Sequence, residues 1–400
     1  MERADWLRAP AGLSRAPGGV TAPAGYEAAG VACGMKPSGL RDIGILVSRR
    51  PAVSAMVDTA SALPAAPVVR NRGLERGALQ AVVVNSSKAN AATGAAGLQD
   101  AHDMGARAAA LLGVPAGRVA VCSTGTIGER LDMAVVGPGI DAAAAALSPG
   151  GGDDFAAAIR TTDRASKAGA FLLDLPAGPA MIGAAAKGAG MISPRMATML
   201  AYVTTDAAVA PHDLQALTAA AARAAFNRIS VDGQMSPSDT LIVLANGDGP
   251  PLGGEARERF GEALAAVCRW LAVQMVKDGE GAEHVVRLLV AGGADDAEAE
   301  RAARAIGNSP LVKTAVFGRD PNWGRISQAV GQALAGAAGA VHEPRVRLDG
   351  VDLGDPGAAA VMARAEYDLE VDLGRGPGAA ELWVSDLTHA YVTLNAEYHT

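Results

Sequence analysis

The order of strand-like and helix-like segments constrains this chain more than any other feature of its sequence. Short apolar runs with β-branched residues predict strands, and longer runs with apolar residues every three or four positions predict amphipathic helices. The predicted strands lie at 42–48, 79–86, 117–131 (a strand followed by a turn), 199–209, 239–247, 283–293, 343–351, 366–374 and 387–400. The predicted helices lie at 90–113 (after a glycine-rich turn), 155–160, 213–229, 255–281, 295–308 and 322–336. Because the two kinds mix without strict alternation, an α+β or layered sandwich is favoured over a plain doubly wound sheet.

Composition narrows the possible partners. The 400 residues are 50% hydrophobic, which is ample for a large core and for more than one domain. The net charge is −7 and no basic stripe interleaves with aromatic residues, so we expect no nucleic-acid partner. No apolar run reaches the roughly 18 residues that a membrane span needs, and we expect no membrane partner. Residues 1–18 have mixed charges and no apolar core, and they predict a flexible tail.

Several kinds of site are excluded by their missing motifs. Cys33, Cys122 and Cys268 are odd in number and far apart, so they form neither a disulfide framework nor a CxxC metal pair. Free thiols indicate a reducing, cytoplasmic setting. The six histidines have no metal-ligand spacing, and the GxxxxGK[ST], HExxH and GxSxG motifs are absent. We therefore expect no metal and no bound cofactor.

The stretch KGAGMISPRMATML, residues 187–200, offers chemistry at Thr198. A threonine hydroxyl is a weak nucleophile unless a base takes its proton, and the α-amine of an N-terminal threonine can be that base. Thr198 is internal, so this scheme requires cleavage of the peptide bond after Ala197. The preceding glycines and Pro194 suit a strained peptide. Chemistry alone leaves open the alternative of an ordinary strand that begins with a threonine after a glycine-rich loop.

The same stretch resembles the self-cleavage motif of the ornithine acetyltransferase (glutamate N-acetyltransferase, ArgJ) family, K-G-x-G-M-I-x-P-x-M-A-T-M-L, at every fixed position. Further similar segments follow in the family's order from about Gly19 to Thr400. They are VVVNSSKANAATG, CSTGTIGERL, RTTD, SVDGQMSPSDT, KDGEGAEH, GRDPNWGRI and DLTHAYVTLNAEYHT. DPNWGR, from Asp320 to Arg325, is given a structural role because it is a good signal for the start of a helix.

The resemblance implies a fold and a processing event. The fold is a four-layer αββα sandwich, mechanistically like the N-terminal-nucleophile hydrolases, with a smaller C-terminal α/β domain. The main domain would cover 19–283 and the smaller one 284–400, whose last residues would return to the active site. Cleavage between Ala197 and Thr198 would give two fragments that stay associated, as an α2β2 heterotetramer.

The resemblance also implies roles for individual residues. Thr198 would be the nucleophile, and Thr124 and Gly125 would form the oxyanion hole. The substrate-binding residues would be Thr161 (with Thr162 close enough to be confused with it), Lys187, Thr198, Glu280, Asn395 and Thr400. Lysine suits a carboxylate, and Glu280 suits the δ-ammonium of ornithine. Since Val392, Leu394, Ala396 and Tyr398 alternate, the strand prediction at the C-terminus puts Asn395 on the opposite face.

The implied reaction is a ping-pong transfer of acetyl from N-acetylornithine to glutamate through an acetyl-threonine, in the cyclic pathway of arginine biosynthesis. Acetyl-CoA is a candidate co-substrate, which would make the enzyme multifunctional. The pattern departs from the family at NSSKANAATG (85–94), at VDGQMSPSD (231–239) and in AMVDTASALPAAPV (55–68). These departures leave the acceptor open. The alternatives are a paralogue of specialised metabolism with another acceptor, an aminopeptidase-like hydrolase, and a binding protein that has lost processing.

Overall fold

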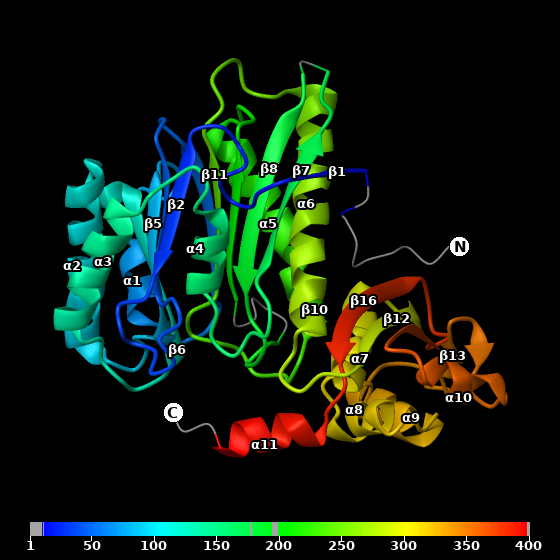
Figure 1. Ribbon diagram of the computed structural model, residues 1–400. Coiled ribbons are helices and arrows are strands. Elements are labelled where there is room, and N and C mark those ends of the chain that lie inside the picture. Colours follow the sequence, from blue (N-terminus) through cyan, green and yellow to red (C-terminus); the bar gives the residue numbers. More distant parts are fainter. Residues whose placement is uncertain (1–9, 11, 177, 194–198, 398–400) are drawn as a thin grey trace.

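The computed structural model describes residues 10, 12–176, 178–193 and 199–397, and these residues form three β-sheets (Figure 1). The six-stranded sheet has the order β1-β7-β8-β9-β11-β4 and the four-stranded sheet the order β2-β3-β5-β6. Their strands are β1 (Ser14–Ala16), β2 (Tyr26–Val31), β3 (Ile43–Ser48), β4 (Val53–Asp58), β5 (Ala81–Lys88), β6 (Val119–Thr126), β7 (Lys167–Leu173), β8 (Ala180–Lys187), β9 (Leu200–Thr205) and β11 (Thr240–Ala245).

Helices cover the outer faces of both sheets, which makes four layers (Figure 1). On the four-stranded sheet lie α2 (Gly94–Leu112) and α3 (Met133–Ala145), and on the six-stranded sheet lie α5 (Pro211–Ala224) and α6 (Gly254–Lys277). Shorter elements of this domain are α1 (Ala66–Arg72), α4 (Gly152–Ala158), η1 (Ala116–Arg118) and η2 (Phe226–Arg228). The predicted αββα sandwich is confirmed.

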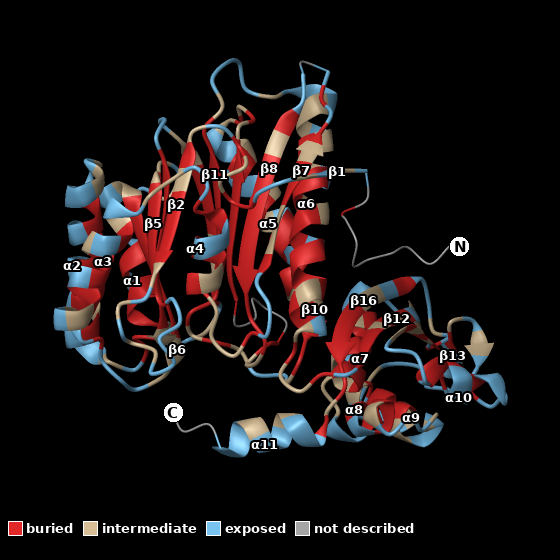
Figure 2. Cartoon of the chain, in the orientation of Figure 1, coloured by how far each residue is buried: buried red, intermediate tan, exposed pale blue. Residues whose placement is uncertain are grey.

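The layers follow from the two-residue period of the strands. In β9, Leu200 and Tyr202 join the core between the two sheets, whereas Ala201 and Val203 join the core beneath α5 and α6. Both faces of β9 are therefore apolar, as expected of a strand buried on two sides. Phe155 of α4 packs edge-on against Tyr202 in the layer between the sheets, with ring centroids 5.2 Å apart. Figure 2 shows the strands of both sheets as buried and the outer helix faces as exposed.

A third sheet forms the smaller domain, with the order β10-β16-β12-β15-β13-β14. Its strands are β10 (Ile229–Ser230), β12 (Val285–Gly293), β13 (Arg345–Leu348), β14 (Val351–Asp352), β15 (Glu366–Asp372) and β16 (Gly378–Ser385). Its helices are α7 (Asp296–Gly307), α8 (Pro310–Phe317), α9 (Trp323–Ala333) and α10 (Gly357–Met362), and they share one apolar core with the sheet. Since β10 pairs with β16, residues 229–230 of the main stretch belong to this third sheet.

The C-terminal stretch corrects one prediction. A strand was predicted over 387–400, but within the described part of that range His389–Glu397 form the helix α11, which extends away from the smaller domain (Figure 1). Thr388 starts the helix, because its side-chain oxygen accepts a hydrogen bond from the Tyr391 N–H at 3.1 Å. The apolar alternation misled because this segment has no sheet edge to join, and none of the residues of α11 with a described exposure is buried.

The N-terminal stretch corrects another expectation. Residues 14–16 of the predicted tail are the strand β1, which pairs antiparallel with β7 at the edge of the six-stranded sheet. Helices α1, α3, α8 and α10 were not predicted, and α3 even contains Pro138. Among the described residues, no helix combines the length and the apolar character that crossing a membrane requires.

Candidate active site

A cavity of about 140 Å³ lies where β6 of one sheet and β8 of the facing sheet end. It brings together residues that are far apart in the sequence: its lining includes Thr124, Gly125, Thr161, Lys187, Glu280 and Asn395. These are all of the predicted site residues that the structure describes. Ala197, Thr198 and Thr400 lie outside the described residues.

Thr124 and Gly125 form one wall of the cavity at the end of β6. Gly125 has φ +130°, and a Cβ there would lie 2.0 Å from the Ser87 carbonyl oxygen on the paired strand β5. Only glycine fits this position. The Lys187 ammonium donates to the Thr124 hydroxyl oxygen at 3.3 Å. The Thr124 O–H therefore remains free to donate to another oxygen.

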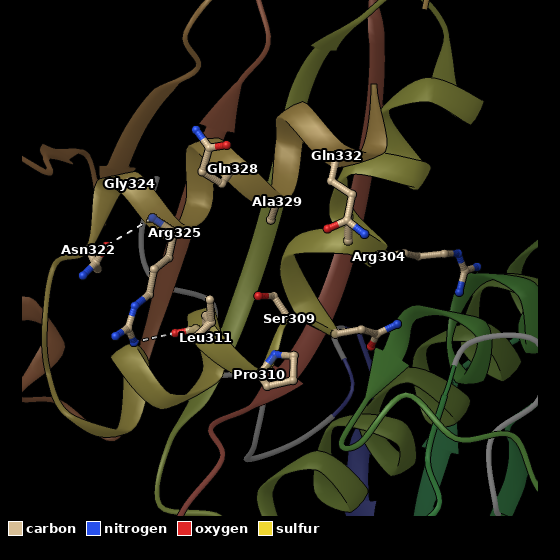
Figure 3. Close-up of a pocket in the computed structure, with 12 residues that line it drawn as sticks. Arg304, Ser309, Pro310, Leu311, Asn322, Gly324, Arg325, Gln328, Ala329 and Gln332 are labelled. Atoms are coloured by element: carbon tan, nitrogen blue, oxygen red, sulfur yellow. Dashed lines mark hydrogen bonds between the residues drawn. The ribbon is translucent and has the colours of Figure 1, made fainter. Parts of the chain in front are cut away.

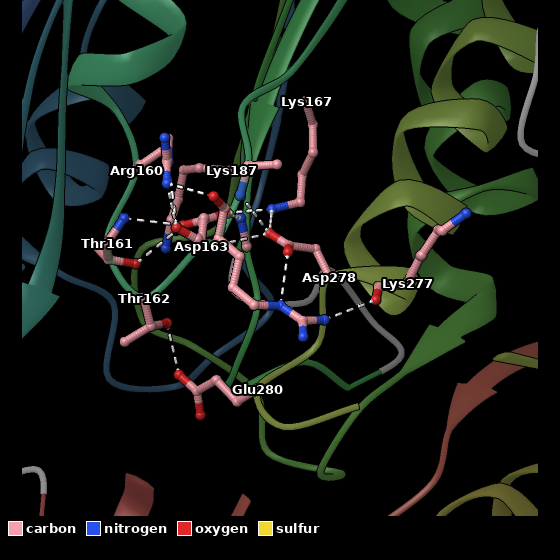
Figure 4. Close-up of polar contacts among 12 residues, drawn as sticks. Arg160, Thr161, Thr162, Asp163, Lys167, Lys187, Lys277, Asp278 and Glu280 are labelled. Carbon is pink, nitrogen blue, oxygen red and sulfur yellow. Dashed lines mark hydrogen bonds and ion pairs between the residues drawn. The ribbon is translucent and has the colours of Figure 1, made fainter. Parts of the chain in front are cut away.

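Lys187, at the end of β8, is 2% exposed and belongs to a charged network (Figure 4). Asp163 accepts from the Lys167 ammonium at 2.5 Å and from the Gly188 N–H at 2.7 Å. Burial lowers the pKa of Lys187, against the opposing effect of the Asp163 charge. Burial alone would raise the pKa of Asp163, but the charges of Lys187 and Lys167 bring it below its ordinary value. Asp163 therefore stays ionised and supports the charge of both lysines.

The network continues to the end of α6, where Asp278 accepts from the Lys167 ammonium at 2.6 Å and from the Arg164 N–H at 3.0 Å. Sequence reasoning did not single out Asp163, Lys167 or Asp278. The available signals were the positions of Asp163 inside the motif RTTD and of Asp278 inside KDGEGAEH, whereas Lys167 lies outside both. The network ties the loop after α4 to the loop after α6, and these two loops carry the cavity's threonines and its glutamate (Figure 4).

Glu280 is oriented by hydrogen bonds on both carboxylate oxygens. Thr162 donates to Oε1 at 2.7 Å and Asn395 donates to Oε2 at 2.9 Å, while the Glu280 N–H donates to the Ala189 carbonyl at 2.8 Å. The carboxylate crosses directly over Gly190, where a Cβ would lie 2.4 Å from it. Asn395 reaches Glu280 from a helix rather than from the predicted strand.

The two threonines of this loop have separate contacts. Thr162 bonds Glu280, whereas the Thr161 N–H donates to Asp163 at 2.9 Å. Both line the cavity. The predicted substrate contact of Thr161 stays a prediction, and both threonines are placed where they could make it.

Two aspartates, the half-buried Asp232 and the buried Asp239, anchor the chain on either side of residues 194–198. Asp232 accepts from the N–H groups of Met191 and Ile192 at 2.6 and 2.9 Å, and Asp239 accepts from the Met199 N–H at 2.9 Å. The other Asp239 oxygen is buried and has no hydrogen-bond partner among the described residues. Burial raises the pKa of Asp239 well above its ordinary value, although the Met199 N–H and the Lys187 charge oppose this.

A larger hollow of about 780 Å³ lies in the smaller domain and contains none of the predicted catalytic residues (Figure 3). Its two arginines already have partners: Arg304 pairs with Glu300, and Arg325 donates to the Leu311 carbonyl at 2.8 Å. Asn322 on its rim caps α9 by accepting from the Arg325 N–H at 3.1 Å, as predicted for the helix entry in DPNWGR. Among the described residues, no group of histidine, cysteine and acidic side chains could hold a metal ion.

The fold and the small cavity define an acyl-transferring enzyme on an αββα sandwich, with an ammonium, a carboxylate and a hydroxyl facing one small-molecule site. The model of the ArgJ family matches residues 27–400, and the chain belongs to that family, the glutamate N-acetyltransferases of arginine biosynthesis.

Curated relatives match over nearly their full length. The arginine biosynthesis bifunctional protein ArgJ of Symbiobacterium thermophilum is 46% identical, over 96% of this chain and 99% of that protein. The protein of the same name from Thermobifida fusca is 41% identical, over 95% of this chain and 100% of that protein. The crystal structure of ornithine acetyltransferase from Mycobacterium tuberculosis, complexed with ornithine, is 40% identical with a TM-score of 0.43, covering 47% of this chain and 98% of that chain.

Proposed function

We propose that this chain cleaves itself between Ala197 and Thr198 and then moves the acetyl group of N-acetylornithine to glutamate through an acetyl ester on Thr198. The observation that carries the proposal is the cavity itself. It holds a hydroxyl, a backbone glycine, a buried ammonium 3.3 Å from that hydroxyl, and an oriented carboxylate.

The first step is self-cleavage. Thr198 Oγ attacks the Ala197 carbonyl, the C–N bond breaks, and the resulting ester is hydrolysed by water to leave a carboxylate on Ala197 and a free amine on Thr198. The anchors at Asp232 and Asp239 support this step because they hold both flanks of the bond. The unpartnered Asp239 oxygen, next to the Met199 N–H, would accept a hydrogen bond from the new α-ammonium.

Cleavage would not separate the fragments. β8 precedes the bond and β9 follows it, and the two strands pair antiparallel from Ile182 opposite Thr205 to Lys187 opposite Leu200. β4 and β11 likewise join residues from both sides of the bond. We therefore expect the fragments to remain associated through their shared sheet and to assemble as α2β2.

Acetyl transfer follows with the Thr198 amine as the base. Thr198 Oγ attacks the acetyl carbonyl, the amine carries the proton to the leaving nitrogen, and ornithine departs. The Thr124 hydroxyl and the Gly125 N–H would stabilise the oxyanion, and one such donor is worth roughly 2.7–4 kcal/mol of barrier. Glutamate then attacks the ester through its amine, and N-acetylglutamate departs.

Substrate binding would use the charged groups that line the cavity. Lys187 would hold the α-carboxylate, and Glu280, oriented by Thr162 and Asn395, would pair with the δ-ammonium of ornithine. Thr161 and Thr400 are proposed as further substrate contacts. Acetyl-CoA remains a candidate second donor.

The test is a product assay with purified protein, N-acetylornithine and glutamate. We expect ornithine and N-acetylglutamate in equal amounts. Release of acetate without N-acetylglutamate would identify a hydrolase instead, and no turnover of N-acetylornithine would refute the proposal.

A further inference from the structure

An apolar groove of about 550 Å³ opens beside the acyl-transfer cavity. Leu63, Pro64, Val69, Leu98 and Met235 supply much of its surface, and none of its lining residues carries a charge. Leu63 is 84% exposed and Val69 is 43% exposed. A groove of this kind does not attract an ammonium or a carboxylate, but it gains free energy by covering an apolar chain.

The groove adjoins the cavity, because Ile127, Met191 and Pro237 line both. Ile127 stands two residues beyond Gly125, the proposed oxyanion donor. Met191 has φ +54°, and its N–H donates a hydrogen bond to Asp232 that holds the backbone of this shared residue in place. An apolar group bonded to the reacting carbonyl carbon would therefore lie beside the groove.

The positions of the charged residues indicate which part of a substrate would lie in the groove. Lys187 and Glu280, the charged groups among the lining residues of the cavity, both belong to the cavity alone. The charged amino-acid part of a donor is therefore held in the cavity, and the end that can enter the groove is its acyl chain. The lining residues in 61–66, 91–94 and 234–237 also fall within the three stretches where the sequence departs from the family pattern.

We propose that the groove binds the acyl chain of the donor, so that the enzyme accepts N-acylornithines with medium-length straight chains as well as N-acetylornithine. This inference rests on the proposed function, because it uses the same ester on Thr198. The bonds made and broken are unchanged: the acyl carbon leaves the donor nitrogen for Thr198 Oγ, and then leaves Thr198 Oγ for the acceptor amine.

The effect of chain length follows from burial. Each methylene covered by apolar side chains is worth up to roughly fourfold in kcat/KM. N-hexanoylornithine carries four methylenes more than N-acetylornithine. We expect kcat/KM to rise along the series from acetyl through butyryl to hexanoyl.

The experiment places a large side chain at the rim of the groove. Ala95 lies in the first turn of α2, is exposed and lines the groove, whereas its neighbour Ala96 is exposed and does not line it. Ala95→Trp should lower kcat/KM for N-hexanoylornithine at least tenfold and leave that for N-acetylornithine within twofold. Ala96→Trp, which has the same cost to the helix, should change neither.

Three outcomes would overturn the inference. The first is rejection of N-hexanoylornithine by a wild-type enzyme that uses N-acetylornithine. The second is an unchanged ratio of the two donors in Ala95→Trp. The third is a change of molecular mass in solution in Ala95→Trp alone, which would mean that a second copy of the chain covers the groove. A wild-type enzyme that does not turn over N-acetylornithine would instead refute the proposed function.

Discussion

Replacing Glu280 with glutamine removes one charge from the cavity and little else. Glutamine has the same shape, its oxygen can still accept from Thr162, and the backbone bond from residue 280 to Ala189 is untouched. An amide flip of Asn395 would restore its contact with residue 280 and give up its hydrogen bond to the Tyr391 carbonyl. The change therefore tests the charge of Glu280 and not its packing.

The expected loss is that of a hydrogen bond between two charged groups. Such a bond contributes about 1.5–3 kcal/mol, so kcat/KM for N-acetylornithine should fall roughly 10- to 150-fold, since about 1.4 kcal/mol is tenfold. The glutamate half-reaction should not suffer in the same way, because the acceptor's side chain is itself an acid and gains nothing from Glu280. Self-cleavage should be unchanged.

The assay measures ornithine release, glutamate-dependent N-acetylglutamate formation and the fraction of cleaved chain. Glu283→Gln is the matched control: it removes the same charge three residues away, at an exposed position outside the lining of the cavity. A loss of less than threefold in kcat/KM for N-acetylornithine would refute the ion pair. An equal loss of self-cleavage would show that Glu280 is structural.

Three further changes probe the same site. Thr198→Ala should leave only the full-length chain on a denaturing gel and abolish acetyl transfer; normal turnover would remove the mechanism. Gly190→Ala should push the Glu280 carboxylate aside, because the added Cβ would lie 2.4 Å from it, and should raise KM for N-acetylornithine about tenfold while cleavage continues; an unchanged KM would contradict the geometry. Lys187 is charged only below its pKa, which burial lowers from 10.5, so KM for N-acetylornithine should rise with pH before an ordinary lysine would lose its proton. Lys187→Arg stays charged and should shift that rise to higher pH; identical profiles would contradict the role of Lys187.

Much of the sandwich could be predicted from local pattern alone. In β3 and β9 every residue is buried and most are apolar, and the apolar residues of α6 from Phe260 to Leu271 recur at helical spacing. These patterns are strong because each element is buried along one or two faces. The sequence reading missed the strands β7 and β8 and the helix α3, although β8 is almost entirely buried. It also misassigned α11, which has no buried side chain among its residues of described exposure and whose capping Thr388 was overlooked.

The site residues, like the secondary-structure elements, were only partly predictable from the sequence. Thr124, Gly125, Lys187, Glu280 and Asn395 sit in recognisable motifs, so a resemblance could find them. The bond from Lys167 to Asp278 joins residues 111 positions apart and depends on how two loops meet, which no local pattern records. The apolar groove likewise exists only because three distant segments fold together.

Mass spectrometry of the purified, active protein tests the central claim most directly. We expect two polypeptides, residues 1–197 and 198–400, and after incubation with N-acetylornithine alone the second should gain the mass of one acetyl group, located on Thr198. Adding glutamate should remove that group and yield N-acetylglutamate. An active preparation that contains only the uncleaved chain, or a second fragment that never carries the acetyl group, would contradict the account.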